Sequence, residues 1–188
     1  MSENGSDLPR PRPSTPEEWR AYLLDYGDTY IRTANEYQLP NITEEQHRTR
    51  WMGREPATEE AVAAAEDRLG VRLPPSLRAF LKASDGWLGV GGWVSEVYPC
   101  AELDWMRDTE SGGYIVDMYR EEGDADDYVA FFERALEVAS GEDFWLLDPA
   151  RVNADGEWGA VLFTPKYGDL EEFPDFISLV HDSHRIML

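Results

Sequence analysis

Cysteine is nearly absent from the 188-residue chain, in which Cys100 is the only one. A lone cysteine excludes an intrachain disulfide and is typical of a reducing compartment. The sequence also has no apolar run long enough to span a bilayer, and its opening residues, MSENGSDLPRPRPS, lack the apolar segment of a secretory signal. These absences predict a soluble, cytoplasmic protein.

Basic residues are scarce as well. The chain has 17 Lys and Arg against 38 Asp and Glu, which gives a formal net charge of −21. Nucleic acids and anionic membranes are bound through cationic side chains, so we expect neither as a partner. The acidity either speeds the encounter with a basic partner or only keeps the protein in solution. Net charge alone leaves both interpretations open.

Motifs for catalysis and metal binding are also missing. No G-x-S-x-G sequence occurs, and the glycine-rich run LGVGGW lacks the Lys and Ser/Thr of a phosphate-binding loop. His181 and His184 have the spacing to face one metal from a helix, but a zinc site needs further ligands. We therefore expect both histidines on a solvent-facing side. The sequence predicts no catalytic residue, no cofactor and no metal site.

What the chain does contain is enough for a hydrophobic core, because 42% of its residues are hydrophobic and 12% are aromatic. We predict a mobile tail over residues 1–13, an N-terminal helical extension over residues 14–56, and one domain over residues 57–188. The extension carries an apolar stripe at helical spacing, which we expect to pack on the domain or self-associate rather than grip a partner. Its members are Trp19, Tyr22, Leu23, Tyr26, Tyr30 and Ala34.

The stretch from Thr58 to Trp87 predicts two helices joined by a rigid corner. Thr58 suits the N-cap of the first helix, and Gly70 suits the left-handed residue that ends it. Pro75 fits the first turn of the second helix, which Asp85 and the glycine after it bring to an end.

The second half of the chain predicts an α+β fold, with a mixed, mainly antiparallel sheet of about four to six strands covered by helices. A helix is expected at about residues 125–134, and a last helix begins near Pro174. The strands are expected within residues 88–99 and at 113–119, 136–139, 144–147 and 158–163, with Asp148-Pro149 stopping the fourth of these.

Several sequence blocks occur in the order found in a known family. The run LGVRLPPSLRAFL, followed by SDGW, resembles the opening helical pair of the SUKH superfamily. The later blocks ALEVASGEDFWLLDP, DGEWGAVLF and FPDFISLV are similar to that superfamily too. It includes Smi/Knr-type cell-wall regulators of fungi and many bacterial toxin-immunity proteins. The resemblance implies a domain without enzymatic activity that binds another protein.

Residues at the ends of predicted elements are the candidates for partner binding. Their alternative role is structural: Gly86 would end a helix, and Asp148 would bond the amides of a turn. For the tryptophans, burial in the core and anchoring of an interface both stay open. The candidates are Asp85, Trp87, Trp93, Asp148, Glu157 and Trp158.

Three functions are compatible with these features. The first is an immunity protein that binds and neutralises a toxin, in particular a basic nuclease whose cleft attracts acidic groups. The second is a regulatory or scaffold protein that uses the N-terminal aromatic helix to join an assembly. The third is an enzyme, which would require an apolar pocket with converging titratable groups. The sequence favours the first.

Overall fold

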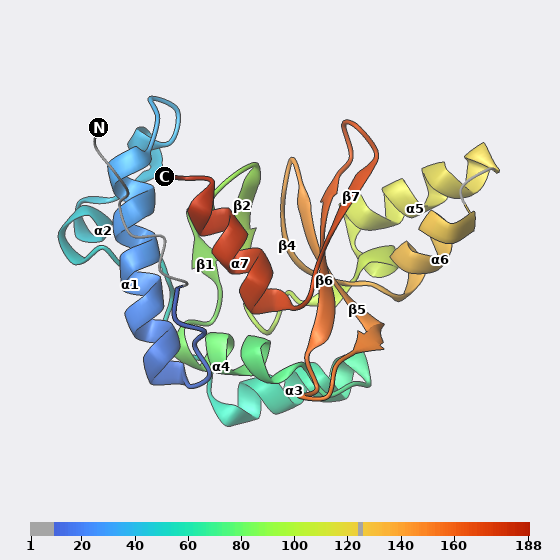
Figure 1. The fold of residues 1–188 in the computed structure, drawn as a ribbon, viewed down its shortest axis with the longest axis horizontal. Helices are drawn as coiled ribbons and strands as arrows, with labels where there is room; N and C mark the ends of the chain where they lie inside the picture. Colours follow the sequence, from blue (N-terminus) through green and yellow to red (C-terminus); the bar gives the residue numbers. More distant parts are fainter. Residues whose placement is uncertain (1–9, 124–125) are drawn as a thin grey trace, which may run out of the picture.

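A computed structural model of the protein describes residues 10–123 and 126–188 (Figure 1). Within these residues helices pack around one seven-stranded sheet, and every strand pairing is antiparallel. This confirms the predicted α+β class. The strand order is β1-β2-β4-β5-β6-β7, with β3 also beside β4. The strands are β1 (Trp87–Leu88), β2 (Val94–Val97), β3 (Asp104–Trp105), β4 (Leu136–Gly141), β5 (Phe144–Val152), β6 (Trp158–Thr164) and β7 (Asp169–Phe173).

Helices cover both faces of the sheet, with α1, α4 and α7 on one side and α5 and α6 on the other (Figure 1). None of the described helices has both the length and the apolar character needed to cross a membrane. The α-helices are α1 (Pro16–Thr33), α2 (Glu44–Thr49), α3 (Glu59–Leu69), α4 (Pro75–Ala83), α5 (Glu110–Glu122), α6 (Asp126–Arg134) and α7 (Phe176–Arg185), and short 3-10 helices span η1 (Leu39–Asn41) and η2 (Met106–Asp108).

Strand β5 separates two hydrophobic clusters. Trp145 and Leu147 join the larger cluster, which lies under α1, α4 and α7. Phe144 and Leu146 point to the other face and join the cluster under α5 and α6. Because successive side chains of a strand alternate between faces, a strand covered on both sides reads as a continuous apolar run.

The run Gly113–Tyr119, which was predicted to be a strand, belongs to helix α5. Thr109 caps the helix by accepting a hydrogen bond from the first turn, and Gly123 ends it in the left-handed conformation. Ile115 is buried and Tyr119 packs against the same cluster, one turn further along the helix. A short apolar run fits both periodicities, and here the caps at the two ends decide for the helix.

Two further differences concern the sheet. Strand β5 does not stop at Asp148-Pro149 but continues to Val152, with a register shift against β6 between Asp148 and Val152. Such an irregularity accommodates a residue that has no N–H to donate to the sheet. Strand β7 was not predicted, since its sequence DLEEF is mostly acidic. The predicted helix 125–134 is confirmed as α6 from Asp126 on, and residue 125 lies outside the described residues.

In the sequence Leu136 and Val138 alternate with Glu137 and Ala139, but strand β4 buries all four of these residues. The Glu137 carboxylate accepts hydrogen bonds from the Tyr98 hydroxyl at 2.8 Å and the Thr109 hydroxyl at 2.7 Å. Burial raises the pKa of Glu137, although these two hydroxyl donors lower it in part.

Helix α1 packs on the domain, as predicted from its aromatic stripe. Thr15 and Glu18 form a capping box at its N-terminus. The buried Trp19 ring lies edge-on to Phe80 of α4, with ring centroids 5.3 Å apart, and 5.8 Å from the Phe176 ring of α7. The aromatic face of α1 is therefore part of the main core.

The predicted tail contacts the same region where it is described, since residues 1–9 lie outside the described part. Arg12 forms an ion pair with Asp175 at the N-terminus of α7, and Pro13 is buried. Residues 10–13 thus lie against the domain. The division of the chain into tail, extension and domain stays a prediction.

The helical pair after Thr58 forms as its sequence predicts. Thr58 caps α3, and Gly70 ends it with a φ of 72°. Helix α4 begins with Pro75 in its first turn and has no side-chain cap of its own. The Glu157 carboxylate supplies that cap from the turn before β6, accepting from the Ser76 amide at 2.8 Å and the Ser76 hydroxyl at 2.6 Å.

His184 is fully buried, which corrects the expectation that both histidines of the last helix face solvent. Its Nδ1 hydrogen-bonds the Tyr22 hydroxyl and its Nε2 the Thr29 hydroxyl, both at 3.0 Å. Arg10 also contacts the ring, and an Asp25 carboxylate oxygen lies 3.8 Å from Nε2. The helix turns this residue toward α1, where two hydroxyl groups satisfy the imidazole.

The buried imidazole predicts a pH-dependent stability. Burial lowers the pKa of His184 to about 4, and the positive charge of Arg10 acts in the same direction. The folded protein therefore binds fewer protons here than the unfolded chain, so its stability falls as the pH drops below the ordinary histidine pKa. This group is expected to remove about 2 kcal/mol of unfolding free energy between about pH 7.5 and about pH 5.

Chemical denaturation of the wild type and of His184→Gln at both pH values measures this effect. Glu137 and Glu157 act in the opposite direction because burial raises the pKa of each. Both chains share those carboxyls, so the difference between the two pH dependences isolates His184. A variant as pH-dependent as the wild type would contradict the assignment.

Candidate functional site

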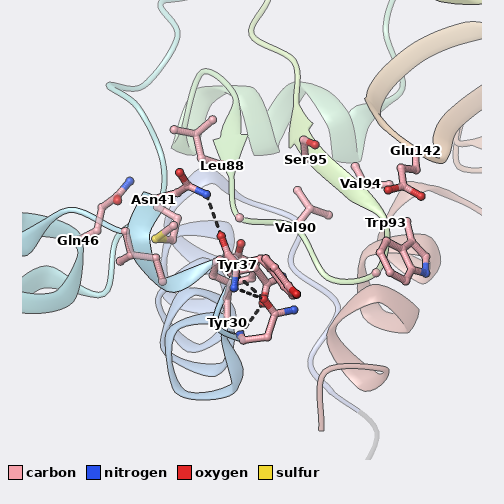
Figure 2. Close-up of a pocket in the computed structure, with 16 residues that line it drawn as sticks. Tyr30, Tyr37, Asn41, Gln46, Leu88, Val90, Trp93, Val94, Ser95 and Glu142 are labelled. Atoms are coloured by element: carbon pink, nitrogen blue, oxygen red, sulfur yellow. Dashed lines mark hydrogen bonds between the residues drawn. The ribbon is translucent and has the colours of Figure 1, made fainter.

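A groove opens between the segment that follows α1 and the loop that joins β1 to β2 (Figure 2). Its volume is about 1020 Å³. Buried Ile42, Met52, Val90 and Val94 contribute its apolar lining. The other residues that line it are Tyr30, Asn35, Tyr37, Gln38, Asn41, Gln46, Leu88, Gly89, Gly92, Trp93, Ser95 and Glu142.

One wall of the groove is a loop held by its own carboxamide groups. The Asn35 side chain accepts hydrogen bonds from the amides of Tyr37, at 2.9 Å, and Gln38, at 3.0 Å. Asn41 donates from its side chain to the Tyr37 carbonyl at 3.1 Å (Figure 2). These bonds fix the backbone, while the Tyr37 side chain stays 79% exposed. The loop thereby exposes an aromatic ring on an ordered backbone. A tyrosine has few rotatable bonds, so a partner that binds this ring orders no long flexible side chain.

The opposite wall is the β1–β2 loop, which is hydrogen-bonded to the core through Tyr26. The buried Tyr26 hydroxyl accepts a hydrogen bond from the Gly91 amide at 2.8 Å and hydrogen-bonds the Ser183 hydroxyl of α7. Gly92 has a φ of 82°, a conformation that favours glycine, and the Ile186 side chain leaves little room for a Cβ there. The contacts with Tyr26 and Ile186 thus hold the loop at the two glycines just before Trp93.

Trp93 and Glu142 lie together at one end of the groove (Figure 2). The Trp93 carbonyl accepts hydrogen bonds from the amides of Glu142, at 2.8 Å, and Asp143, at 3.0 Å. The Trp93 side chain is 68% exposed, the most exposed of the tryptophans in the structure. The turn between β4 and β5 therefore places an acid beside an open indole ring.

The chemistry of the lining suits recognition of another polypeptide. Carboxamides can donate to and accept from a backbone, and aromatic rings supply apolar contact at low entropic cost. Of the described residues that line the groove, Glu142 is the only charged one. Across residues 10–123 and 126–188, no group of three or more His, Cys, Asp or Glu is placed to hold a metal ion.

The structure brings only one of the six sequence candidates, Trp93, to this groove. Trp87 is buried and lies edge-on to Trp51 with ring centroids 5.0 Å apart. Trp158 is buried in β6. Asp85 accepts a hydrogen bond from the Cys100 amide at 2.7 Å. These contacts are the structural roles that the sequence left open beside partner binding.

The two remaining acidic candidates are also engaged inside the protein. Asp148 accepts from two nitrogens of the Arg134 guanidinium, at 2.8 and 2.9 Å, and from the Ala150 amide at 2.9 Å. Burial opposes ionisation of Asp148, but the Arg134 bonds outweigh it and hold the pKa below its usual range. Glu157 caps α4, and burial raises the pKa of its carboxyl. Neither carboxylate lines the groove.

Sequence reasoning missed most of the groove, including Tyr37, Leu88 and Glu142. The available signal for the first wall was the run NEYQLPN, residues 35–41, whose amides and proline are typical of an ordered loop. The meeting of that loop with residues 88–95 is a tertiary contact that no local pattern reports.

Comparison with known proteins gives one family. The family model described as SMI1 / KNR4 family (SUKH-1) matches residues 56–188. No curated protein matches the chain. The matched range contains one wall of the groove, with Trp93 and Glu142, while the wall around Tyr37 precedes it.

Proposed function

Because the chain belongs to the SMI1/KNR4 (SUKH-1) family, we propose that it is a non-enzymatic, cytoplasmic protein-binding domain that acts as an immunity protein. Its partner in this proposal is a basic toxin domain, with a nuclease as the first expectation. The protein would neutralise the toxin by occupying its surface. Nucleic acid and membrane are not partners in this proposal.

The observation that carries the proposal is the pair of exposed aromatic side chains across the groove. Tyr37 and Trp93 line it from opposite walls, and both keep most of their surface open to solvent. Tyrosine and tryptophan are enriched among residues that dominate binding energy at protein interfaces. Because the backbone of each wall is fixed by hydrogen bonds, little conformational entropy is lost on binding.

The charge of the chain supports a basic partner. Residues 104–134, which span helices α5 and α6, carry ten acidic and three basic side chains, and the whole chain has a net charge of −21. Such a field attracts a positively charged domain over several ångströms and raises the association rate at low salt. A nuclease needs a cationic surface for its substrate's phosphates, so it fits this field.

The alternative is a regulatory or scaffold protein that uses the aromatic face of α1 to join an assembly. That face contains Trp19, Leu23 and Tyr26, and all three side chains are buried in the main core. A partner could reach them only if α1 left the domain. We therefore place the binding surface of either kind of protein at the groove.

Photo-crosslinking in the cells that naturally make this protein tests the proposal. We expect p-benzoylphenylalanine at position 37 or 93 to capture the same basic protein. Tyr114, on α5, is 72% exposed and does not line the groove, so it is the matched control position. Support also requires that the captured protein be toxic alone and harmless when the wild-type chain is present. Equal capture at position 114, or no adduct at positions 37 and 93, would contradict the proposal.

A further inference from the structure

The exposed Trp93 ring has no cation over it, whereas several other aromatic rings among the described residues do. Arg20 lies over the Trp51 ring at 4.4 Å, Arg107 over Trp105 at 5.8 Å, and Lys166 over Tyr167 at 5.4 Å from the ring centroid. Within residues 10–123 and 126–188 no Lys or Arg is placed over Trp93 in this way. The indole face that is most open to solvent is therefore free to accept a cation.

The acid beside Trp93, Glu142, also lacks a cationic partner among the described residues. Glu142 lines the groove and forms no ion pair with any side chain in the described part of the protein. Among the residues that the structure describes, no Lys or Arg lines the groove. Next to Glu142, burial raises the pKa of the Asp143 carboxyl, and the charge of Glu142 raises it further. The end of the groove thus holds a carboxylate that is in no ion pair within the described residues.

We propose that Trp93 and Glu142 form a subsite for an arginine side chain of the partner, stacked on the indole and paired with the carboxylate. Arginine fits because its planar guanidinium stacks on an aromatic face while its N–H groups point sideways toward an acid. The inference rests on the groove being the proposed binding face. It adds which kind of partner residue this face recognises, namely an arginine exposed on the partner's surface.

The fixed backbone around the subsite supports this role. The Glu142 and Asp143 amides hold the Trp93 carbonyl, and Tyr26 holds the loop at Gly91. The backbone that carries the ring and the acid is therefore held in place without a ligand. Because this backbone is already ordered, only the two side chains lose conformational freedom when a guanidinium enters.

Titration of the isotope-labelled full chain with Nα-acetyl-L-arginine methylamide tests the subsite by NMR. The probe's uncharged isostere, the corresponding citrulline derivative, is the control ligand. We expect the Trp93 indole N–H signal, identified by its loss in Trp93→Phe, to shift with the arginine probe and not with citrulline. Glu142→Gln is expected to weaken the arginine affinity about two- to fivefold.

Glu60→Gln is the matched control, because Glu60 is exposed on α3 and its substitution changes the net charge equally. It is expected to leave the affinity for the arginine probe unchanged. Equal shifts with citrulline, an unmoved Trp93 signal, or equal weakening by Glu60→Gln would overturn the subsite. Crosslinking at position 37 reports partner docking independently, so failure of the arginine subsite is distinguishable from failure of the proposed function.

Discussion

A chain that lacks residues 1–40 is expected not to fold. The truncation removes α1, whose Trp19, Leu23 and Tyr26 side chains are buried in the main core against α4 and α7. Without them the apolar faces of both helices would be exposed to water. It also removes the Tyr26 hydroxyl, which joins the β1–β2 loop to α7. The remaining chain is expected to show no cooperative unfolding transition by circular dichroism in urea.

A single substitution tests the same packing without removing the helix. Trp19→Ala is expected to lower the unfolding free energy by about 3–5 kcal/mol, because the side chain is fully buried among aromatic rings of α4 and α7. Leu24→Ala is the matched control on α1, since Leu24 is exposed and alanine favours the helix. Equal destabilisation by both substitutions, or a truncated chain that folds normally, would contradict the account.

Local patterns were sufficient to predict the helical pair after Thr58. Its N-cap, the left-handed Gly70 and the proline in the second helix are each decided by neighbouring residues. The same kind of reasoning failed for α5, since the short run from Gly113 satisfies both the helical and the strand periodicity. It failed for His184 because the direction of a helical side chain depends on which helices pack around it.

The candidate site was predicted only at one residue. Trp87, Trp93 and Trp158 all lie in β-rich segments, yet the first and last are buried and Trp93 is open. The difference arises because Trp93 follows a glycine pair in a loop, while the other two begin strands covered by helices. The groove itself joins segments about fifty residues apart in the sequence, and only tertiary packing reveals such a pair of walls.

Removing both exposed aromatic side chains of the groove is expected to have the largest effect on function. Each anchor of this kind contributes about 2 kcal/mol or more to a protein interface, and the effects of two anchors need not add. Tyr37→Ala with Trp93→Ala is therefore expected to weaken partner binding roughly hundredfold or more. Because both side chains are largely exposed, the unfolding free energy is expected to change by only about 0.5 kcal/mol per substitution.

The control pair is Tyr114→Ala with Tyr167→Ala, two tyrosines that are also highly exposed but do not line the groove. It removes a comparable amount of aromatic surface elsewhere on the protein. The control pair is expected to bind the partner as the wild type does. A loss confined to the groove pair would assign the binding to this surface rather than to exposed aromatic residues in general.

The most direct measurement titrates the toxic activity of the basic protein captured at position 93 with increasing amounts of each chain. The account predicts that the wild type and the Tyr114/Tyr167 pair neutralise it at equal concentrations. The Tyr37/Trp93 pair is expected to require roughly a hundredfold more. Neutralisation by the groove pair at the wild-type concentration would show that the groove is not where this protein binds its partner.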